Sequence, residues 1–182
     1  EEGLERLAVA SYSATIGTSD TVAPHPSLHE LVARFAFGKL SRAPARFDVE
    51  ELRALNAKLL HALPFETVAP WLLTMGIGGG EEFWIAVRSN LAVLSDASDW
   101  WQVVTGPLQP VIADAALCGE AAALLPPEPW DASTWERWSA DVKQATGIKA
   151  KALFQPLRLA LTGREHGPEL KLLLPLIGHA RA

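Results

Sequence analysis

Residues 48–63 read DVEELRALNAKLLHAL, and this stretch predicts the clearest helix of the chain. Its leucines recur at spacings of three and four, which places Leu52, Leu55, Leu59 and Leu60 on one face of an α-helix. Asp48 stands where an N-terminal cap is expected, and an acidic residue follows three positions later, as in a capping box. We therefore predict an amphipathic helix that buries its leucine stripe.

The same periodicity recurs on both sides of this stretch. Ser27 and Glu30 repeat the capping pattern ahead of another apolar face. We expect further helices over residues 4–16, 28–35, 66–75, 83–93, 96–104, 113–125, 131–146, 154–161 and 168–177. Few stretches alternate apolar and polar residues with the period of a strand, so the sequence predicts an all-α fold.

Composition limits the class of protein. The chain has 182 residues, 49% of them hydrophobic, which suits one domain or two small ones and argues against disorder. No run approaches the roughly 18 apolar residues of a membrane helix. A single cysteine excludes an internal disulfide and a multi-cysteine zinc site. The glycine-rich loop at residues 76–80 is a plausible domain boundary.

Charge is distributed unevenly along the chain. The net charge is −5, but residues 81–140 carry −7 and residues 141–182 carry +4. A basic end on an acidic body can meet a polyanion. An ordinary solvated surface gives the same pattern, so charge alone leaves both interpretations open.

Motifs for chemistry are absent from the sequence. Residues 76–80 (GIGGG) lack the pattern of a phosphate-binding loop, and no GxSxG nucleophile motif occurs. His25 and His29 lie four apart, but Pro26 stands between them. The seven tryptophans are expected mainly in the core. We therefore assign no catalytic residue and no metal ligand.

Residues 155–171 read QPLRLALTGREHGPELK and are unusual. Arg158 lies among leucines, where a guanidinium must reach solvent, find a partner or contact a ligand. A turn carrying Arg164 and His166 follows, and a helix is expected from Pro168. Free N–H groups at a helix start favour anions. A plain helix–turn–helix corner explains these residues equally well.

At these residues the sequence resembles the bacterial glutamyl-tRNA synthetases. The run from Pro156 to Gly163 (PLRLALTG), followed by HGP at 166–168, is similar to that family's C-terminal signature. The family pattern also fits RFD at 46–48, LRALN at 52–56, PFE at 64–66 and LIG at 176–178, in the same order. The resemblance covers essentially the whole chain.

The resemblance implies a tRNA-binding, C-terminal part of such an enzyme. The family's catalytic domain carries HIGH-like and KMSKS-like motifs, and neither occurs here. The parent enzyme is expected to use ATP and Mg²⁺ to attach glutamate to tRNA. We expect no cofactor in this chain and no glutamate activation by it alone.

The resemblance also implies two regions and their contacts. Residues 1–66 correspond to a helical stem-contact domain, in which Arg42 and Arg46 are expected to meet the RNA backbone, although a structural role is equally compatible. Residues 67–182 correspond to an anticodon-binding helical domain. Its expected contacts are Arg88, Asn90, Arg158, Arg164, His166, Gly167, Pro168 and Leu170. Glu169 and Lys171 depart from the family pattern.

Asn90 is a further departure. Many members of the family have arginine at the aligned position, associated with selecting a cytosine in the anticodon of glutamate tRNA. Asn90 offers both a donor and an acceptor, so it suits cytosine or uracil. The expected partner is therefore glutamate tRNA and also, with relaxed selectivity, glutamine tRNA. Arg88 can substitute from one turn away.

Two other classes stay open: a helical protein-interaction module with no RNA role, and a hydrolase on an all-α scaffold. For the hydrolase we find no nucleophile–base pair. We expect a cytoplasmic protein, since no signal peptide is evident. We also expect a monomer without DNA or membrane partners.

Overall fold

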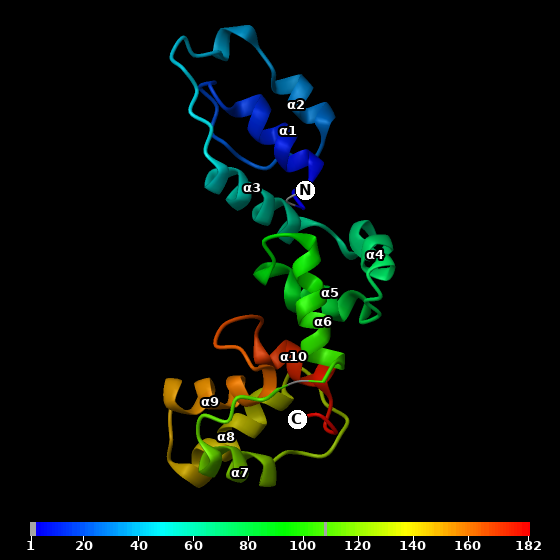
Figure 1. The fold of residues 1–182 in the computed structure, drawn as a ribbon, viewed down its shortest axis with the longest axis vertical. Coiled ribbons are helices and arrows are strands. Elements are labelled where there is room, and N and C mark those ends of the chain that lie inside the picture. Colours follow the sequence, from blue (N-terminus) through cyan, green and yellow to red (C-terminus); the bar gives the residue numbers. More distant parts are fainter. Residues whose placement is uncertain (1–2, 108) are drawn as a thin grey trace. The chain divides into compact units, whose positions relative to one another are not determined.

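The computed structural model describes residues 3–107 and 109–182, and in these residues it is all-α, as predicted (Figure 1). Its helices are joined by turns, and the described part has no β-strand beyond an isolated bridge between Thr18 and Leu40. The chain divides into two compact units. Unit 1 runs to Leu72 and includes Leu91–Ala97, and unit 2 holds Leu73–Asn90 and Ser98–Ala182.

Unit 1 is built on α1 (Arg6–Thr15), α2 (Leu28–Arg34) and α3 (Val49–Ala62), with a 3-10 turn, η1, at Phe37–Lys39. Tyr12 of α1 packs with Leu52 and Leu55 of α3 in its core. The Tyr12 hydroxyl accepts the Asp48 N–H at 2.8 Å. The two caps are confirmed, because Ser27 accepts the Glu30 N–H and Asp48 accepts the N–H groups of residues 50 and 51.

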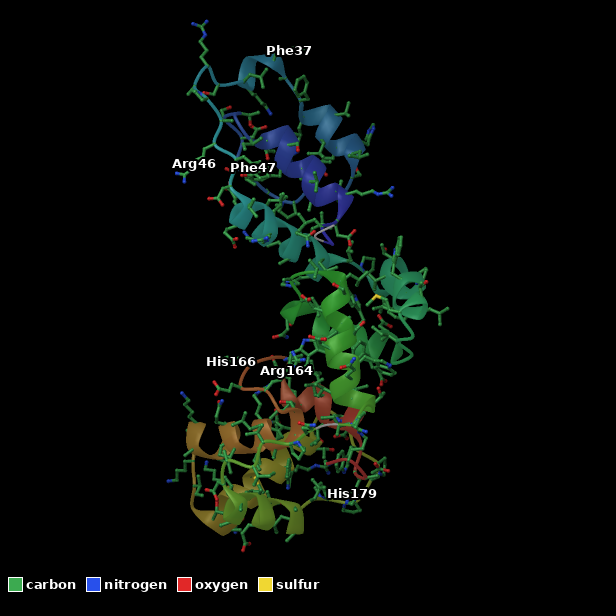
Figure 2. The ribbon with its side chains drawn as sticks, viewed as in Figure 1. Phe37, Arg46, Phe47, Arg164, His166 and His179 are labelled. Carbon is green, nitrogen blue, oxygen red and sulfur yellow. The ribbon has the colours of Figure 1, made fainter. Side chains whose placement is uncertain are left out.

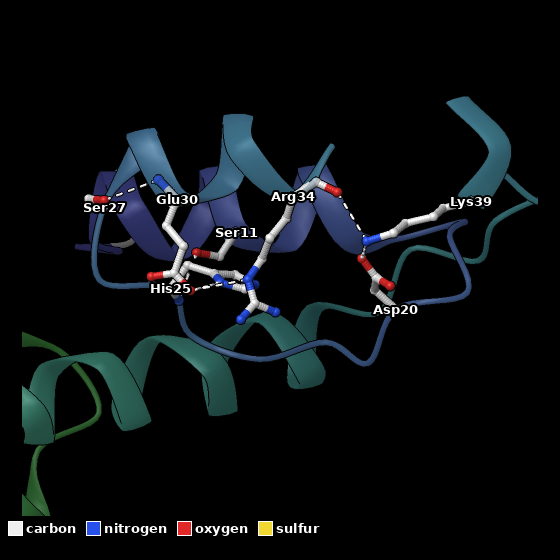
Figure 3. Close-up of polar contacts among 7 residues, drawn as sticks. All are labelled: Ser11, Asp20, His25, Ser27, Glu30, Arg34 and Lys39. Atoms are coloured by element: carbon white, nitrogen blue, oxygen red, sulfur yellow. Dashed lines mark hydrogen bonds and ion pairs between the residues drawn. The ribbon is translucent and has the colours of Figure 1, made fainter. Parts of the chain in front are cut away.

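A cluster of polar contacts fixes the loop before α2 (Figure 3). His25 is buried, and its Nδ1 lies 3.5 Å from the Glu30 carboxylate, which also pairs with Arg34 at 3.1 Å. Lys39 pairs with Asp20 at 2.8 Å. His25 therefore has a structural role in unit 1. Throughout the described residues, no group of three or more His, Cys, Asp or Glu side chains is arranged to hold a metal ion.

The segment after residue 87 corrects one sequence expectation. The helix predicted over residues 83–93 is α5 (Gly80–Val87), followed by a 3-10 turn, η2 (Arg88–Asn90). The chain then leaves the helix because side chains of α3 bind its carbonyl groups. Asn56 Nδ2 donates to the Ala92 carbonyl at 2.8 Å, and His61 Nε2 lies 2.8 Å from the Leu91 carbonyl oxygen.

Helix α4 (Phe65–Thr74) follows α3 along the chain, and α6 (Ala97–Thr105) follows a 3-10 turn at Leu94–Asp96. Both lie within about one residue of the predicted ranges. No helix in the described ranges is long and apolar enough to cross a membrane.

Unit 2 gathers α7 (Ala115–Ala123), α8 (Thr134–Thr146), α9 (Lys151–Thr162) and α10 (Leu170–Ile177) around one core (Figure 1). Helix α8 packs against α7 and α10, α9 packs against α7, and α10 packs against α5. Glycines in the left-handed region end α8 at Gly147 and α9 at Gly163. The core contains Leu117, Trp138, Val142, Leu153, Leu157, Leu161, Leu170 and Leu174.

Candidate nucleic-acid interface

The turn between α9 and α10 is anchored on Trp100 of α6. Gly167 has φ +145°, and a Cβ built there would lie 2.0 Å from Trp100 Cη2, so only glycine fits. The Arg164 guanidinium lies over the Trp100 ring, 4.8 Å from its centroid, and 3.4 Å from the Asp99 carboxylate. Figure 2 shows Arg164 and His166 on this turn. The turn is thus held in one place.

Arg158 contacts the same turn through one of its two terminal nitrogens. Its Nη2 donates to the Pro168 carbonyl at 3.0 Å. Its Nη1 is buried, and in residues 3–107 and 109–182 it is the only buried side-chain nitrogen or oxygen without a hydrogen-bond partner. Burial lowers the pKa of the Arg158 guanidinium, although an arginine remains a cation in proteins. A buried donor of this kind is costly unless a ligand satisfies it.

Arg158 lines a groove of about 240 Å³ whose other walls are Trp135, Phe154, Glu169, Leu170 and Lys171. The rings of Trp135 and Phe154 lie 5.9 Å apart, and 44% of the Phe154 surface is exposed. Lys171 pairs with Glu169 at 2.7 Å, and this contact raises the pKa of the Lys171 ammonium. The groove therefore combines aromatic surface with hydrogen-bond donors, which is the chemistry that receives an unstacked base.

Sequence reasoning missed Trp135 and Phe154. Trp135 and Trp138 lie three residues apart on α8, and the sequence leads us to expect the tryptophans mainly in the core. The structure places Trp138 there, 3% exposed, but leaves Trp135 half-buried on the groove wall. A spacing of three residues puts two side chains on one helix face but does not say where that face meets the protein surface.

The other anticodon candidates lie around the same unit. Gly167 and Pro168 belong to the turn, and Leu170 is 4% exposed, mostly within the core, with part of its surface on the groove. His166 is exposed. Arg88 and Asn90 lie on η2, after α5, which packs against α10. Asn90 is exposed, and its Nδ2 donates to Ser89 Oγ at 3.2 Å.

The two stem-contact candidates lie in unit 1, on the connector between η1 and α3. Arg42 and Arg46 are exposed. Figure 2 shows the Arg46 side chain extending away from the chain. Within the part of the chain that the structure describes, neither side chain has a hydrogen-bond or ion-pair partner. Both cations are therefore available to a phosphate.

Comparisons with known proteins found a matching family model and similar sequences. Residues 113–182 match the family model "Anticodon binding domain". The whole chain is 55% identical to a glutamate–tRNA ligase 2 from Methylobacterium sp. (strain 4-46) and 53% identical to a glutamate–tRNA ligase 1 from Parvibaculum lavamentivorans. It spans 41% and 40% of the lengths of these two relatives.

Solved structures show the same fold. A glutamate tRNA ligase from Elizabethkingia meningosepticum, crystallised in complex with its amino acid, matches 100% of the chain with a TM-score of 0.81 at 19% identity. Its counterpart from Elizabethkingia anophelis matches 99% of the chain with a TM-score of 0.75 at 18% identity. The chain covers 40% and 39% of these proteins. The chain is therefore similar in sequence to a part of glutamate–tRNA ligases, it shares the fold of a part of two solved members of that group, and its residues 113–182 match an anticodon-binding domain.

Proposed function

We propose that this chain is the tRNA-binding, C-terminal part of a glutamate–tRNA ligase and that its groove receives a base of the anticodon loop. The observation that carries the proposal is the buried, unpartnered Nη1 of Arg158 beside two aromatic rings. This groove lies within the residues that match the anticodon-binding model. An RNA loop supplies what the groove lacks, because its unstacked bases expose acceptor edges and planar faces.

The groove residues have distinct parts in this proposal. Arg158 Nη1 donates to a keto oxygen or ring nitrogen of the base. Trp135 and Phe154 contact the base through their rings, since stacking is tolerant of base identity. Arg164 and Lys171 lie close to the turn and offer charge to the phosphates on either side of the base.

Unit 1 has a different role in the proposed function. We assign residues 1–66 to the stem-contact domain and residues 67–182 to the anticodon-binding domain. Arg42 and Arg46 meet the backbone of the RNA duplex, because the deep major groove of A-form RNA prevents side chains from reading bases there. The remaining anticodon contacts are Arg88, Asn90, His166, Gly167, Pro168 and Leu170.

The whole ligase uses ATP and Mg²⁺ to attach glutamate to tRNA in the cytoplasm, and we place that chemistry outside this chain. The protein acts as a monomer on glutamate tRNA and, given Asn90, also on glutamine tRNA. Relatives of the chain carry the name glutamate–tRNA ligase, which supports this assignment.

Titration of labelled tRNA with the chain tests the proposal. Binding should weaken steeply between about 50 mM and about 200 mM salt, because released counterions drive it. Arg158→Ala should weaken binding by roughly 1–3 kcal/mol, the range of a specific base contact.

The matched control is Arg137→Ala, which removes the same charge from the surface of α8, where Arg137 pairs weakly with Asp131 at 3.7 Å. It should bind nearly as well as the unmodified chain. Equal losses in both variants would reduce Arg158 to a general charge effect. Salt-independent capture of a protein partner, without RNA binding, would favour an interaction module instead.

A further inference from the structure

Helix α2 turns most of its apolar side chains to solvent. Within residues 28–34, all of which the structure describes, only Leu31 is buried. Leu28 is 62% exposed, Val32 is 74% exposed, and Phe35, which follows the last residue of the helix, is 53% exposed. Spacings of four and three residues place these three side chains on one stripe of the helix. A helix normally turns such a stripe toward a protein interior, so this one indicates a missing partner surface.

Phe37 extends the stripe beyond the end of α2. It lies on η1 and is 80% exposed. Its ring meets the ring of Phe35 edge to face, with the two centroids 5.2 Å apart. Figure 2 shows Phe37 on this turn. We call Leu28, Val32, Phe35 and Phe37 the apolar ridge. A single exposed apolar residue is ordinary, but a continuous row of them marks an interaction surface.

The charged residues of α2 lie on another side of the helix. Glu30 and Arg34 pair at 3.1 Å, and the Glu30 carboxylate lies 3.5 Å from His25 Nδ1 in the loop before α2. Figure 3 shows the Glu30 and Arg34 side chains pointing toward that loop. The ridge itself contains no charged residue. Because RNA is held by cations on its phosphates and by rings that stack on its bases, a ridge that is half aliphatic suits a protein partner better.

The partner surface that is tethered closest to the ridge belongs to the rest of the ligase. The chain spans 41% and 40% of two relatives, so about three-fifths of each relative lies outside it. Under the proposed function, that larger part precedes residue 1 and leads into α1. Helix α1 packs on α2 and has ten residues, which makes it about 15 Å long. The preceding part of the ligase is therefore held within a short distance of the ridge.

The small size of the ridge favours docking within one chain. A stable interface between separate proteins buries about 800 Å² on each partner, with about 20–30 residues a side. Interfaces between domains of one chain are as small as about 600 Å². A tethered partner also acts at an effective concentration of about a millimolar, which a second copy of the chain does not reach in dilute solution.

We infer that the apolar ridge is the surface on which the preceding part of the ligase docks, through an apolar groove of that part. The inference rests on the proposed function, which makes this chain the C-terminal part of the enzyme. It gives α2 a role separate from the stem-contact arginines and from the anticodon groove. Docking at the ridge fixes unit 1 relative to the part to which we assign the chemistry with ATP.

Hydroxyl-radical footprinting with mass spectrometry tests the inference by comparing the 182-residue chain with the full-length ligase, both without tRNA. Phe35 and Phe37 should be oxidised at least about fivefold more slowly in the ligase, because residues at the centre of an interface lose their contact with water. Phe154 is the control within the same proteins. It is 44% exposed, and it should be oxidised at the same rate in both because its groove must stay open to RNA.

A matched pair of variants tests the ridge directly. In the full-length ligase, Val32→Asp should restore the oxidation of Phe37 to the rate in the 182-residue chain, because an apolar interface does not accept an unpaired carboxylate. Leu73→Asp makes a comparable change at an apolar residue that is 75% exposed on α4, and it should leave Phe37 protected. In the 182-residue chain, Val32→Asp should leave the midpoint of urea unfolding unchanged, since Val32 faces solvent there.

Three results would overturn the inference. They are equal oxidation of Phe37 in the chain and the ligase, protection that grows with the concentration of the 182-residue chain, which indicates a second copy, and protection that requires tRNA. None of them bears on the groove of Arg158. Conversely, a failure of tRNA to bind overturns the proposed function and leaves the footprint, which is measured without RNA, to be judged separately.

Discussion

Gly167 is the residue whose replacement should most directly disturb the turn between α9 and α10. In Gly167→Ala the new methyl group would enter the Trp100 ring, and the backbone there has φ +145°. Overpacking and strain together should lower the free energy of unfolding by about 2–4 kcal/mol. Urea denaturation followed by tryptophan fluorescence measures the loss.

Gly119→Ala is the control for this experiment. Gly119 lies inside α7, and a Cβ there meets nothing within 4 Å. The change should stabilise the protein by about 0.5–1 kcal/mol, because alanine favours the helix. Equal effects at both glycines would contradict the assigned role of Trp100.

Asn56 joins three segments of unit 1 through a side chain that is fully buried. Its Oδ1 accepts the Glu5 N–H at 2.7 Å, and its Nδ2 donates to the Ala92 carbonyl at 2.8 Å. Asn56→Ala leaves both backbone groups without partners and should cost about 2–4 kcal/mol. Thermal unfolding monitored by circular dichroism checks this, with Asn90→Ala, on the surface, expected to change stability by less than about 0.5 kcal/mol.

At the scale of the element, Asp48 determines where α3 begins. Its carboxylate accepts the N–H groups of Glu50 at 2.9 Å and Glu51 at 3.3 Å. Asp48→Ala should lower the free energy of unfolding by about 1 kcal/mol, as expected for loss of an N-terminal cap. Asp48→Asn keeps an acceptor and should retain most of the stability. Chemical denaturation of the two variants compares them, and identical losses would show that charge, not capping, is responsible.

The caps were predictable from sequence because they depend on neighbours within three residues. The end of α5 was not predictable in this way. The chain leaves the helix after Asn90 because Asn56 and His61, some 30 or more positions earlier, bind the carbonyls of residues 91 and 92. The N–H groups of Ala92 and Val93 donate to Asp96. Only the folded structure shows these long-range partners.

The candidate site also contains some residues that the sequence predicts and others that it does not. Arg158 was conspicuous in the sequence because a cation stood among leucines, and the turn was visible from its glycines. The aromatic walls were not, since they come from α8 and α9 and depend on how these helices pack. A side chain that neither breaks a pattern nor belongs to a motif gives no signal before its neighbours are known.

At the scale of the whole molecule, the proposed function raises the question of which tRNA an enzyme containing this chain accepts. Asn90 is exposed and makes only a local bond to Ser89, so its amide is free to turn toward either kind of base edge. We expect relaxed discrimination between glutamate and glutamine tRNAs. Asn90→Arg should shift the ratio toward glutamate tRNA, because arginine only donates. Aminoacylation of both tRNAs by the full-length enzyme measures this ratio.

The outcome is informative in either direction. If the unmodified enzyme already rejects glutamine tRNA and Asn90→Arg leaves the ratio unchanged, residue 90 does not set the choice. In that case the same aminoacylation test should be applied to a substitution of Arg88, which lies on the same 3-10 turn.

The buried, unsatisfied nitrogen of Arg158 has a consequence for how the sequence evolves. Selection for stability alone would replace this arginine with an apolar residue of similar length, because a desolvated cation with an unpartnered donor costs stability. Selection for binding opposes that replacement. Under the proposed function, Arg158 is thus a compromise between stability and binding. A redesign guided only by folding energy would replace it, and we expect the resulting protein to be more stable and to bind RNA less well.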